Sequence, residues 1–175
     1  MIDDVILVDE HDNEIGTMQK MEAHVEGKLH RAFSVFIFNT KGELLLQQRA
    51  LDKYHSGGKW TNTCCSHPRV GEATADAANR RLQEEMGMKC NLKPGFSFTY
   101  HAVLAEDLSE NEYDHVFFGL SNDLPLLNTE EAADYKYTTL KDLKADIAAN
   151  ADQYTVWLKI CLDKVIAYYE QHPIS

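Results

Sequence analysis

The 175-residue sequence has little basic charge. It carries 17 Lys and Arg residues against 28 Asp and Glu residues, for a net charge of −11. A nucleic-acid-binding protein is expected to carry a basic patch or stripe, and none is visible in the sequence. No apolar run approaches the ~18 residues of a membrane helix, and the start, Met1-Ile2-Asp3-Asp4, lacks the basic and apolar segments of a signal peptide. We therefore expect a soluble cytoplasmic protein with neither a nucleic-acid nor a membrane partner.

Cysteine, proline and glycine are also scarce, with four, four and nine residues. Without a secretory signal, the cysteines are expected to be free thiols in a reducing compartment. No linker, repeat or low-complexity tract divides the chain, so we expect one domain over residues 1–175, acting as a monomer. A chain of this length buries roughly 70% of its unfolded surface and needs no disulfide or metal to fold.

The apolar pattern predicts strands first, and helices mid-chain and at the C-terminus. Small and apolar residues recur at helical spacing from Ala75 to Met86, and Gly87 ends that helix. The glycine-containing segment 39–43 predicts a hairpin loop. The expected strands are 5–8, 33–38, 44–48, 96–104 and 113–120, and the expected helices are 74–86, 140–150 and 152–169. This order predicts an α/β fold of the α+β type, a mixed-sheet α/β/α sandwich rather than a doubly wound sheet.

The mid-chain helix carries two Arg–Glu pairs at i, i+4, Arg80 with Glu84 and Arg81 with Glu85. One interpretation is a solvated helix face with ion pairs. However, both pairs run Arg before Glu, which is the weaker order for helix support. With Glu72 ahead of the helix, the spacing resembles the Nudix box, a loop–helix motif that holds magnesium in a superfamily of diphosphate-cleaving enzymes.

The match to the Nudix box departs at two positions. Ser66 stands where the box has Gly, and Arg81 stands where it has Glu. The second change removes a carboxylate that holds magnesium in the hydrolases, and it adds a guanidinium fork suited to phosphate. The pattern therefore still indicates the fold. Hydrolysis of a nucleoside diphosphate derivative becomes the second-ranked function.

Two adjacent cysteines lie in the segment 60–68, which reads WTNTCCSHP. In an extended segment neighbouring side chains alternate, so Cys65 and His67 share one side while Cys64 faces the other. A lone cysteine is usually a small buried hydrophobe, and this is our interpretation of Cys64. The neighbours of Cys65 make it a candidate functional thiol instead.

Residues of the types that bind metals are scattered through the polar stretches, namely His24, His30, His67, Glu110 and Glu112. In extended geometry the two glutamates point the same way, as two ligands on one metal would need. Three imidazoles and two carboxylates suit a divalent metal, with zinc, manganese and magnesium all as candidates. The alternatives are unrelated surface residues, or a metal-binding module without catalytic activity.

Taken together, these segments resemble the type I isopentenyl diphosphate isomerases, and the resemblance covers roughly residues 4 to 165. It rests on the order and spacing of six segments: 20–24 (KMEAH), 29–34 (LHRAFS), 45–49 (LLQQR), 60–68, Arg80-Arg81 and Glu110-Asn111-Glu112. The sequence departs from the family at Gly57, where proline is usual, and in the short interval between His24 and His30. Neither departure removes a chemical group.

The resemblance implies that the double bond of isopentenyl diphosphate is moved, through a tertiary carbocation, to give dimethylallyl diphosphate. It implies Cys65 and Glu112 as the groups that add and remove protons on opposite faces, and it leaves open which of them protonates the alkene. Tyr100 matches a tyrosine that hydrogen-bonds the acid–base residue, and Trp157 matches a tryptophan that lies over the cation. From pattern alone, Tyr100 is equally a sheet tyrosine and Trp157 a core residue of its helix.

The resemblance also implies the ligands of the site. One divalent metal, manganese, zinc or magnesium, is expected on His24, His30, His67, Glu110 and Glu112. A second magnesium ion would bridge Glu85 and the phosphates of the substrate. The family's basic residues that hold the diphosphate correspond to Lys20, Arg49, Lys53 and Arg81. No flavin is expected.

Overall fold

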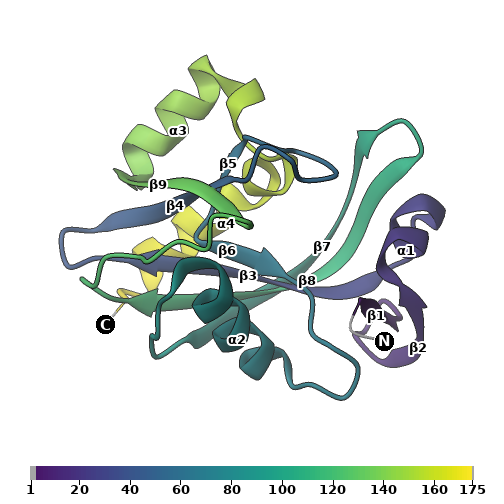
Figure 1. The fold of residues 1–175 in the computed structure, drawn as a ribbon. Helices are drawn as coiled ribbons and strands as arrows, with labels where there is room; N and C mark the ends of the chain where they lie inside the picture. Colours follow the sequence, from purple (N-terminus) through teal and green to yellow (C-terminus); the bar gives the residue numbers. More distant parts are fainter. Residues whose placement is uncertain (1–2, 175) are drawn as a thin grey trace.

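The computed structural model of the protein describes residues 3–174, which form a mixed sheet with helices on both faces (Figure 1). Helix α2 (Thr74–Met86) covers one face, and α3 (Leu140–Ala149) and α4 (Val156–Gln171) lie on the other. A short helix, α1 (Lys20–Glu26), packs against the long β7–β8 hairpin at one end of the sheet. The expected mixed-sheet α/β/α sandwich is therefore confirmed.

The central strand is β3, which pairs in parallel with β8 along its whole length and antiparallel with β6. The β8 strand continues the sheet by pairing antiparallel with β7. In chain order the strands are β1 (Asp4–Val8), β2 (Glu14–Gln19), β3 (His30–Phe38), β4 (Glu43–Arg49), β5 (Trp60–Thr61), β6 (Cys64–Ser66), β7 (Lys93–Ala105), β8 (Leu108–Leu120) and β9 (Ala132–Thr139).

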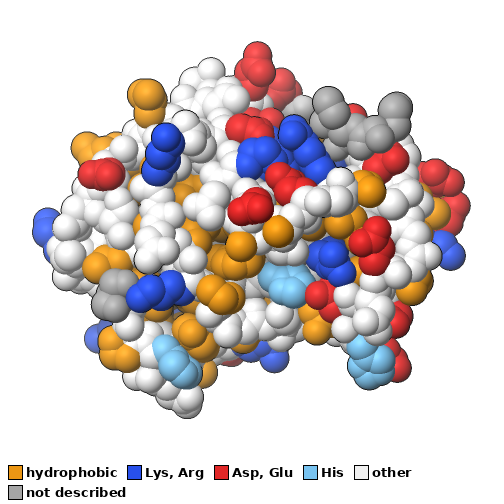
Figure 2. Space-filling model, turned by 90° about the horizontal axis from the view of Figure 1, so that it is seen from below, with side chains coloured by type: hydrophobic (Ala, Val, Ile, Leu, Met, Phe, Trp, Pro, Cys, Tyr) orange, Lys and Arg blue, Asp and Glu red, His pale blue; other side chains and the backbone are white. Residues whose placement is uncertain are grey.

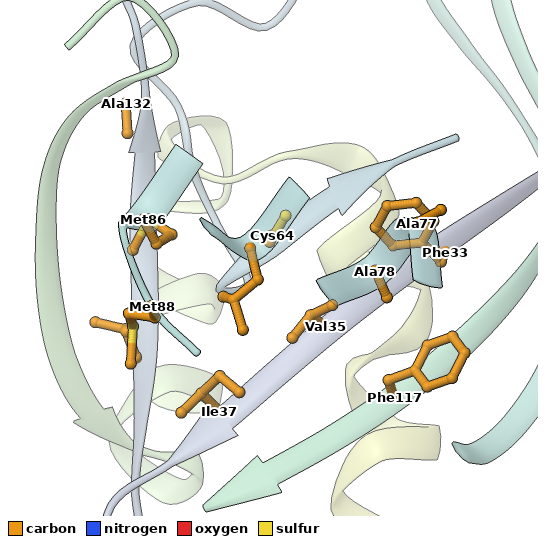
Figure 3. Packing of buried hydrophobic residues seen from close by; sticks show 12 residues of the cluster. Phe33, Val35, Ile37, Cys64, Ala77, Ala78, Met86, Met88, Phe117 and Ala132 are labelled. Carbon is orange, nitrogen blue, oxygen red and sulfur yellow. The ribbon is translucent and has the colours of Figure 1, made fainter. Parts of the chain in front are cut away.

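Alternate residues of β3 contribute to two separate apolar cores, because side chains along a strand point to opposite faces. Phe33, Val35 and Ile37 pack with residues of α2 in one buried cluster (Figure 3). Phe36 and Phe38 pack with residues of α4 in the other. All five side chains are almost fully buried. Covering both faces of β3 in this way fixes its register, since a slip of one residue would exchange the two cores.

The helix predicted over residues 74–86 is confirmed at both ends as α2. It ends at Gly87, which adopts the left-handed conformation with φ 62°. This conformation carries no Cβ penalty for glycine. The helix predicted over 140–150 is confirmed as α3, and the strand predicted over 5–8 as β1.

The predicted hairpin between residues 33–38 and 44–48 is confirmed, with residues 39–42 as the loop between two antiparallel strands, but its ladder is short. The β3 and β4 strands pair only at Phe38 and Leu44. Beyond that pair they diverge, because β3 continues against β6 and β8 while β4 continues against β5 and β9. The local turn signal therefore identified the hairpin but not the further partners of its strands.

The C-terminal helix was predicted over 152–169, but it begins only at Val156. Ala151–Gln153 form a separate 3₁₀ turn. The Thr155 side chain ends this irregular stretch by accepting a hydrogen bond from the backbone N–H of Leu158 at 3.4 Å, which caps the new helix. Capping by threonine stabilises a helix start by ~1 kcal/mol, so the helix begins there rather than earlier.

Five further elements, β2, α1, β5, β6 and β9, were not predicted as such from the sequence. All four cysteines are free, as expected. Among the described residues, no helix is long and apolar enough to cross a membrane. In the view from below, Lys and Arg side chains lie among Asp and Glu side chains, and no broad basic area is visible on that face (Figure 2).

Candidate active site

One pocket brings together residues that are far apart in the sequence. It holds about 570 Å³ of empty space, open solvent at its mouth included. The predicted site residues that line it are Lys20, Arg49, Lys53, Cys65, His67, Arg81, Glu85, Tyr100, Glu110, Glu112 and Trp157. The remaining two, His24 and His30, are fully buried and lie beside Glu110 and His67.

The acidic side of the pocket is built by β8. Glu110, Glu112 and Asp114 are alternate residues of this strand and therefore project from the same face. His30 of β3 and Tyr100 of β7 are the direct neighbours of Glu112 in the sheet, one on each side. The prediction that Glu110 and Glu112 point the same way is thus confirmed, and the sheet register explains why His30 and Tyr100 meet there.

Four side chains, His24, His30, His67 and Glu110, form a group whose potential ligand atoms all lie within 4.8 Å of one another. The Nδ1 atom of His24 lies 2.7 Å from the Lys20 carbonyl, and that of His30 lies 2.8 Å from the Lys28 carbonyl. Because a carbonyl only accepts, these Nδ1 atoms carry the ring protons. In each neutral ring the Nε2 atom then presents a lone pair to the group.

The hydrogen bonding of this group fits a bound cation. The Nε2 lone pair of His24 lies 2.9 Å from Oε1 of Glu110, which is itself an acceptor, so no proton joins the two atoms when the ring is neutral. Burial lowers the pKa values of His24, His30 and His67, the last to about 4, which keeps the rings neutral. The Oε2 atom of Glu110 is buried without a hydrogen-bond partner among the described residues. Ring Nδ1–H groups held by carbonyls, with Nε2 turned inward, are the usual arrangement of metal-binding histidines.

Glu112 is held from several directions. Its Oε2 atom lies 2.9 Å from Nε2 of His67 and 3.6 Å from Nε2 of His30, and its Oε1 atom accepts a hydrogen bond from the Tyr100 hydroxyl. Burial, followed by the charge of Glu110, raises the pKa of Glu112. The carboxyl is therefore fixed in orientation, and its surroundings shift it toward the acid form relative to a carboxyl in water.

Cys65 lies on β6, opposite Ser34 of β3. Its thiol donates a hydrogen bond to Oδ1 of Asn62 at 3.0 Å, and the Ser34 hydroxyl approaches its sulfur at 3.8 Å. Burial, followed by the charge of Asp114, raises the pKa of the Cys65 thiol to about 12, so the thiol keeps its proton at neutral pH. Because β3 lies between β6 and β8, Cys65 and Glu112 belong to different strands on either side of it.

Cys64 points to the opposite face, as predicted from the alternation. It is fully buried in the cluster beneath α2 (Figure 3), and its thiol donates to Oε2 of Glu85 at 3.2 Å. Only Cys65 of the two cysteines lines the pocket. The distinction between a structural and a functional cysteine therefore follows from strand geometry.

The predicted basic residues Lys20, Arg49, Lys53 and Arg81 gather along the pocket wall. Burial, followed by the charge of Lys53, lowers the pKa of Lys20, which shows how close the cations are. Arg81 contacts Glu85 and Glu131 at 3.2 Å each. The buried Nε atoms of Arg49 and Arg81 have no hydrogen-bond partner among residues 3–174. These two N–H groups are therefore free to donate hydrogen bonds to an anion that enters the pocket.

The Trp157 ring lies at the pocket with the Arg49 guanidinium 5.2 Å from its centroid and the His55 ring in edge contact at 5.8 Å. Its side chain is 5% exposed. It is absent from the apolar cluster that contains its helix neighbours Leu158 and Cys161. Trp157 therefore faces the pocket rather than the centre of the core.

Several lining residues were not predicted from the sequence. His55 lies 3.5 Å from Oε1 of Glu110, and burial lowers its pKa to about 3. Asp114 accepts a hydrogen bond from Ser34 at 2.7 Å, and burial raises its pKa well above the ordinary value. The third is Glu131, between Lys53 and Arg81. Asp114 carried a usable signal, since it continues the alternation of Glu110 and Glu112, whereas His55 and Glu131 lie in loops without a pattern.

Comparison with known proteins first identifies the class. The sequence model of the NUDIX domain family matches residues 28–158, which is most of the chain. Among solved structures, a Deinococcus radiodurans protein has the same fold, with a TM-score of 0.78 at 20% identity over 92% of this chain and 98% of that one. The chain is thus a member of the NUDIX class of proteins.

Two curated relatives narrow the class to a family. Isopentenyl-diphosphate Delta-isomerase 2 of Aromatoleum aromaticum is 54% identical over 167 residues, covering 95% of this chain and 88% of the relative. Isopentenyl-diphosphate Delta-isomerase 2 of Photorhabdus laumondii is 56% identical over 155 residues, covering 89% and 88%. The chain belongs to the isopentenyl-diphosphate Delta-isomerase family.

Proposed function

We propose that this chain is an isopentenyl-diphosphate delta-isomerase, which interconverts isopentenyl diphosphate and dimethylallyl diphosphate in isoprenoid biosynthesis. The observation that carries the proposal is the combination, in one pocket, of a thiol (Cys65), a carboxyl (Glu112) and a set of basic side chains. Arg81, which pairs with Glu85, argues against hydrolysis of a nucleoside diphosphate, because it occupies a position where the hydrolases need a carboxylate.

Cys65 and Glu112 are proposed as the pair that moves the protons. One of them delivers a proton to the terminal CH₂ carbon of the alkene, and the resulting tertiary cation loses a proton from its adjacent CH₂ to the other. Because the reaction is reversible, the acid of one direction is the base of the other. The close contact of His67 with Glu112 and the hydrogen bond from the Tyr100 hydroxyl support this role, since they fix the carboxyl toward the pocket.

A divalent metal is proposed on His24, His30, His67, Glu110 and Glu112. The fit rests on the inward lone pairs of the rings and on the unpartnered Glu110 oxygen. When bound, the metal supplies positive charge that orients Glu112 and lowers its pKa, opposing the effect of burial. Manganese, zinc and magnesium all suit such a mixed donor set.

The diphosphate group is proposed to bind Lys20, Arg49, Lys53 and Arg81, with a second magnesium ion beside Glu85. Gathering four cations in one pocket is how a protein with a net charge of −11 can attract a polyanion. Arginine suits this role because its fork donates two parallel hydrogen bonds to phosphate oxygens.

We further propose that the chain acts as a single-domain monomer over residues 1–175 in the cytoplasm.

The direct test is to incubate the metal-loaded protein with isopentenyl diphosphate and magnesium, and to follow the dimethylallyl isomer by NMR. We expect the two isomers to reach equilibrium without release of inorganic phosphate. Phosphate release from nucleoside diphosphate derivatives, with no isomer formed, would instead identify a hydrolase. Metal uptake with neither reaction would identify a metal-binding module.

A further inference from the structure

One carboxylate stands within the basic wall of the pocket. Glu131 forms ion pairs with both Lys53 and Arg81, the latter at 3.2 Å, and its side chain is 23% exposed. Burial would raise the pKa of Glu131, but the hydrogen bond from Lys53 and the charge of Arg81 outweigh it and lower the pKa. Glu131 is therefore an anion at neutral pH, bound to two of the four proposed diphosphate-binding residues.

The backbone around Glu131 fixes its place in the pocket. Its N–H donates to the Asn128 carbonyl at 2.9 Å, and its carbonyl accepts from the Ala50 N–H at 3.1 Å. The Asn128 N–H in turn donates to the Glu85 carbonyl in α2 at 3.0 Å. The turn is thus tied both to the end of β4 and to α2. Only the side chain of Glu131 is left to rotate, and its partial exposure gives it a path to solvent.

We infer that Glu131 is an internal competitor for the diphosphate site: its carboxylate occupies Lys53 and Arg81 until the substrate displaces it. The inference rests on the proposed function, because it requires these cations to bind the substrate. A diphosphate and a carboxylate cannot both contact the same two cations without repelling each other. The substrate therefore breaks two ion pairs on entry, and the carboxylate re-forms them when the product leaves.

The structure also provides a reason for keeping such a competitor. Four cations that face one pocket repel each other, and the charges of Lys53, Arg49 and Arg81 add to burial, the largest cause, in lowering the pKa of Lys20. Glu131 offsets this repulsion in the free protein and holds the long Lys53 and Arg81 side chains in the pocket. The same contacts weaken binding of the substrate and the product equally, since both carry the same diphosphate. Glu131 is thus a residue that sets affinity, and it need not touch the reacting carbons.

The test is calorimetric titration of inorganic diphosphate into the metal-loaded protein with excess magnesium. In Glu131→Gln the dissociation constant is expected to fall about three- to tenfold, the factor that loss of one or two partly exposed ion pairs gives. Glu130→Gln is the matched control, because it makes the same charge change at the adjacent, exposed position. Its dissociation constant should stay within about twofold of the wild type.

Glu131→Ala is a second variant that also removes the carboxylate and keeps the backbone hydrogen bonds. It replaces Glu131→Gln in the test if the glutamine variant does not fold. In either variant the KM for isopentenyl diphosphate should fall while kcat does not rise. An unchanged or weaker affinity for diphosphate would overturn the inference, and a weaker one would mean that Glu131 positions the cations for the ligand. With normal isomerisation, that result overturns this inference alone. A wild-type protein that binds no diphosphate would overturn it together with the proposed function.

Discussion

Along one face of β8 the side chains change from acidic to apolar. Glu110, Glu112 and Asp114 are followed at the same spacing by Val116 and Phe118. The first three line the pocket, whereas the last two belong to the apolar core beneath α4. The two halves share one strand and one face, and they differ only in residue type.

The strands on either side of β8 change in the same direction. On β3, His30 and Ser34 are followed by Phe36 and Phe38, and on β7 Phe96 precedes Tyr100. The register aligns these changes, since Glu112 pairs with both His30 and Tyr100, while Phe118 pairs with Phe36. The apolar half thus stabilises the sheet and excludes water from one side of the pocket, and the polar half places titratable groups next to it. If so, substitutions in the two halves should have separable effects.

Removing metal should have the largest effect on the polar half. A chelator is expected to abolish isomerisation, because the metal neutralises and orients the carboxyls that are buried beside it. Replacing any one of His24, His30, His67 or Glu110 should weaken metal retention, since the site loses both affinity and geometry with one donor. Metal content after dialysis, measured by elemental analysis, reports this independently of activity. His101→Ala, at an exposed position of β7, is the control. A metal-free protein that isomerises normally would refute the role of Glu112 proposed above.

Removing a proton-transfer group is the next largest change. Cys65→Ala and Glu112→Gln should each lower turnover by several orders of magnitude and leave the fold intact, because each removes one of the two proton carriers. Every tenfold loss corresponds to ~1.4 kcal/mol of transition-state stabilisation. Cys64→Ala is the matched control, since this cysteine lies on the other face, and it should stay active with at most a modest loss of stability. Turnover within tenfold of the wild type in either pocket variant would contradict the assignment.

The apolar half should respond in the opposite way. Phe118→Ala is expected to lower the free energy of unfolding by about 3–5 kcal/mol, because it leaves a cavity in the core. Phe118 is 2% exposed and stacks on Tyr168 with ring centroids 4.7 Å apart. Turnover measured well below the melting temperature should stay near the wild type. Val103→Ala, at a side chain that is 73% exposed, should change stability by less than ~0.5 kcal/mol. A loss of turnover in Phe118→Ala without a loss of stability would remove the separation between the halves.

The elements that the sequence predicted well are those with strong local signals. Helix α2 combines a helical apolar period with a terminal glycine, and the aromatic and β-branched residues of 113–120 identified the second part of β8, which begins at Leu108. Helix α1 was missed because it has only seven residues, of which only Ala23 and His24 are buried, so no apolar period could reveal it. The β3–β4 hairpin was predicted, but the longer ladders of its strands with β8 and β9 were not, because a local turn cannot encode partners that lie far along the chain.

The candidate site divides in the same way. Alternation alone separated Cys65 from Cys64 and placed Glu110 with Glu112. The meeting of His24, His30 and His67 required tertiary structure; their residue types made a shared metal site a hypothesis, and the family resemblance supported it. Glu131 escaped prediction because nothing in the sequence distinguishes it from Glu130, which is exposed. The difference between them is made by the backbone bond from Ala50 and by the cations of two distant elements.

Substitution of Trp157 is expected to have the smallest effect. It also tests most directly where the boundary between the apolar and polar halves lies. Trp157 lies in the first turn of α4, where Leu158, Cys161 and Leu162 belong to the core, yet its own ring lies at the pocket. The Arg49 guanidinium near the ring already makes a contact of the cation–π type. In the proposed reaction the ring would stabilise the tertiary cation in the same manner.

An indole face stabilises a nearby cation by ~2 kcal/mol or more when desolvated, and a phenyl face does so less well. Losing ~2 kcal/mol from the transition state slows a reaction about thirtyfold. We therefore expect turnover to fall in the order Trp157, Trp157→Phe, Trp157→Leu, with substrate affinity changing much less than rate. Both variants should also lose some stability, because the ring is 5% exposed and packs against its neighbours. Measuring turnover well below the melting temperature separates the two effects. A leucine variant that melts earlier yet turns over like the wild type would assign Trp157 to the apolar half, as a packing residue alone.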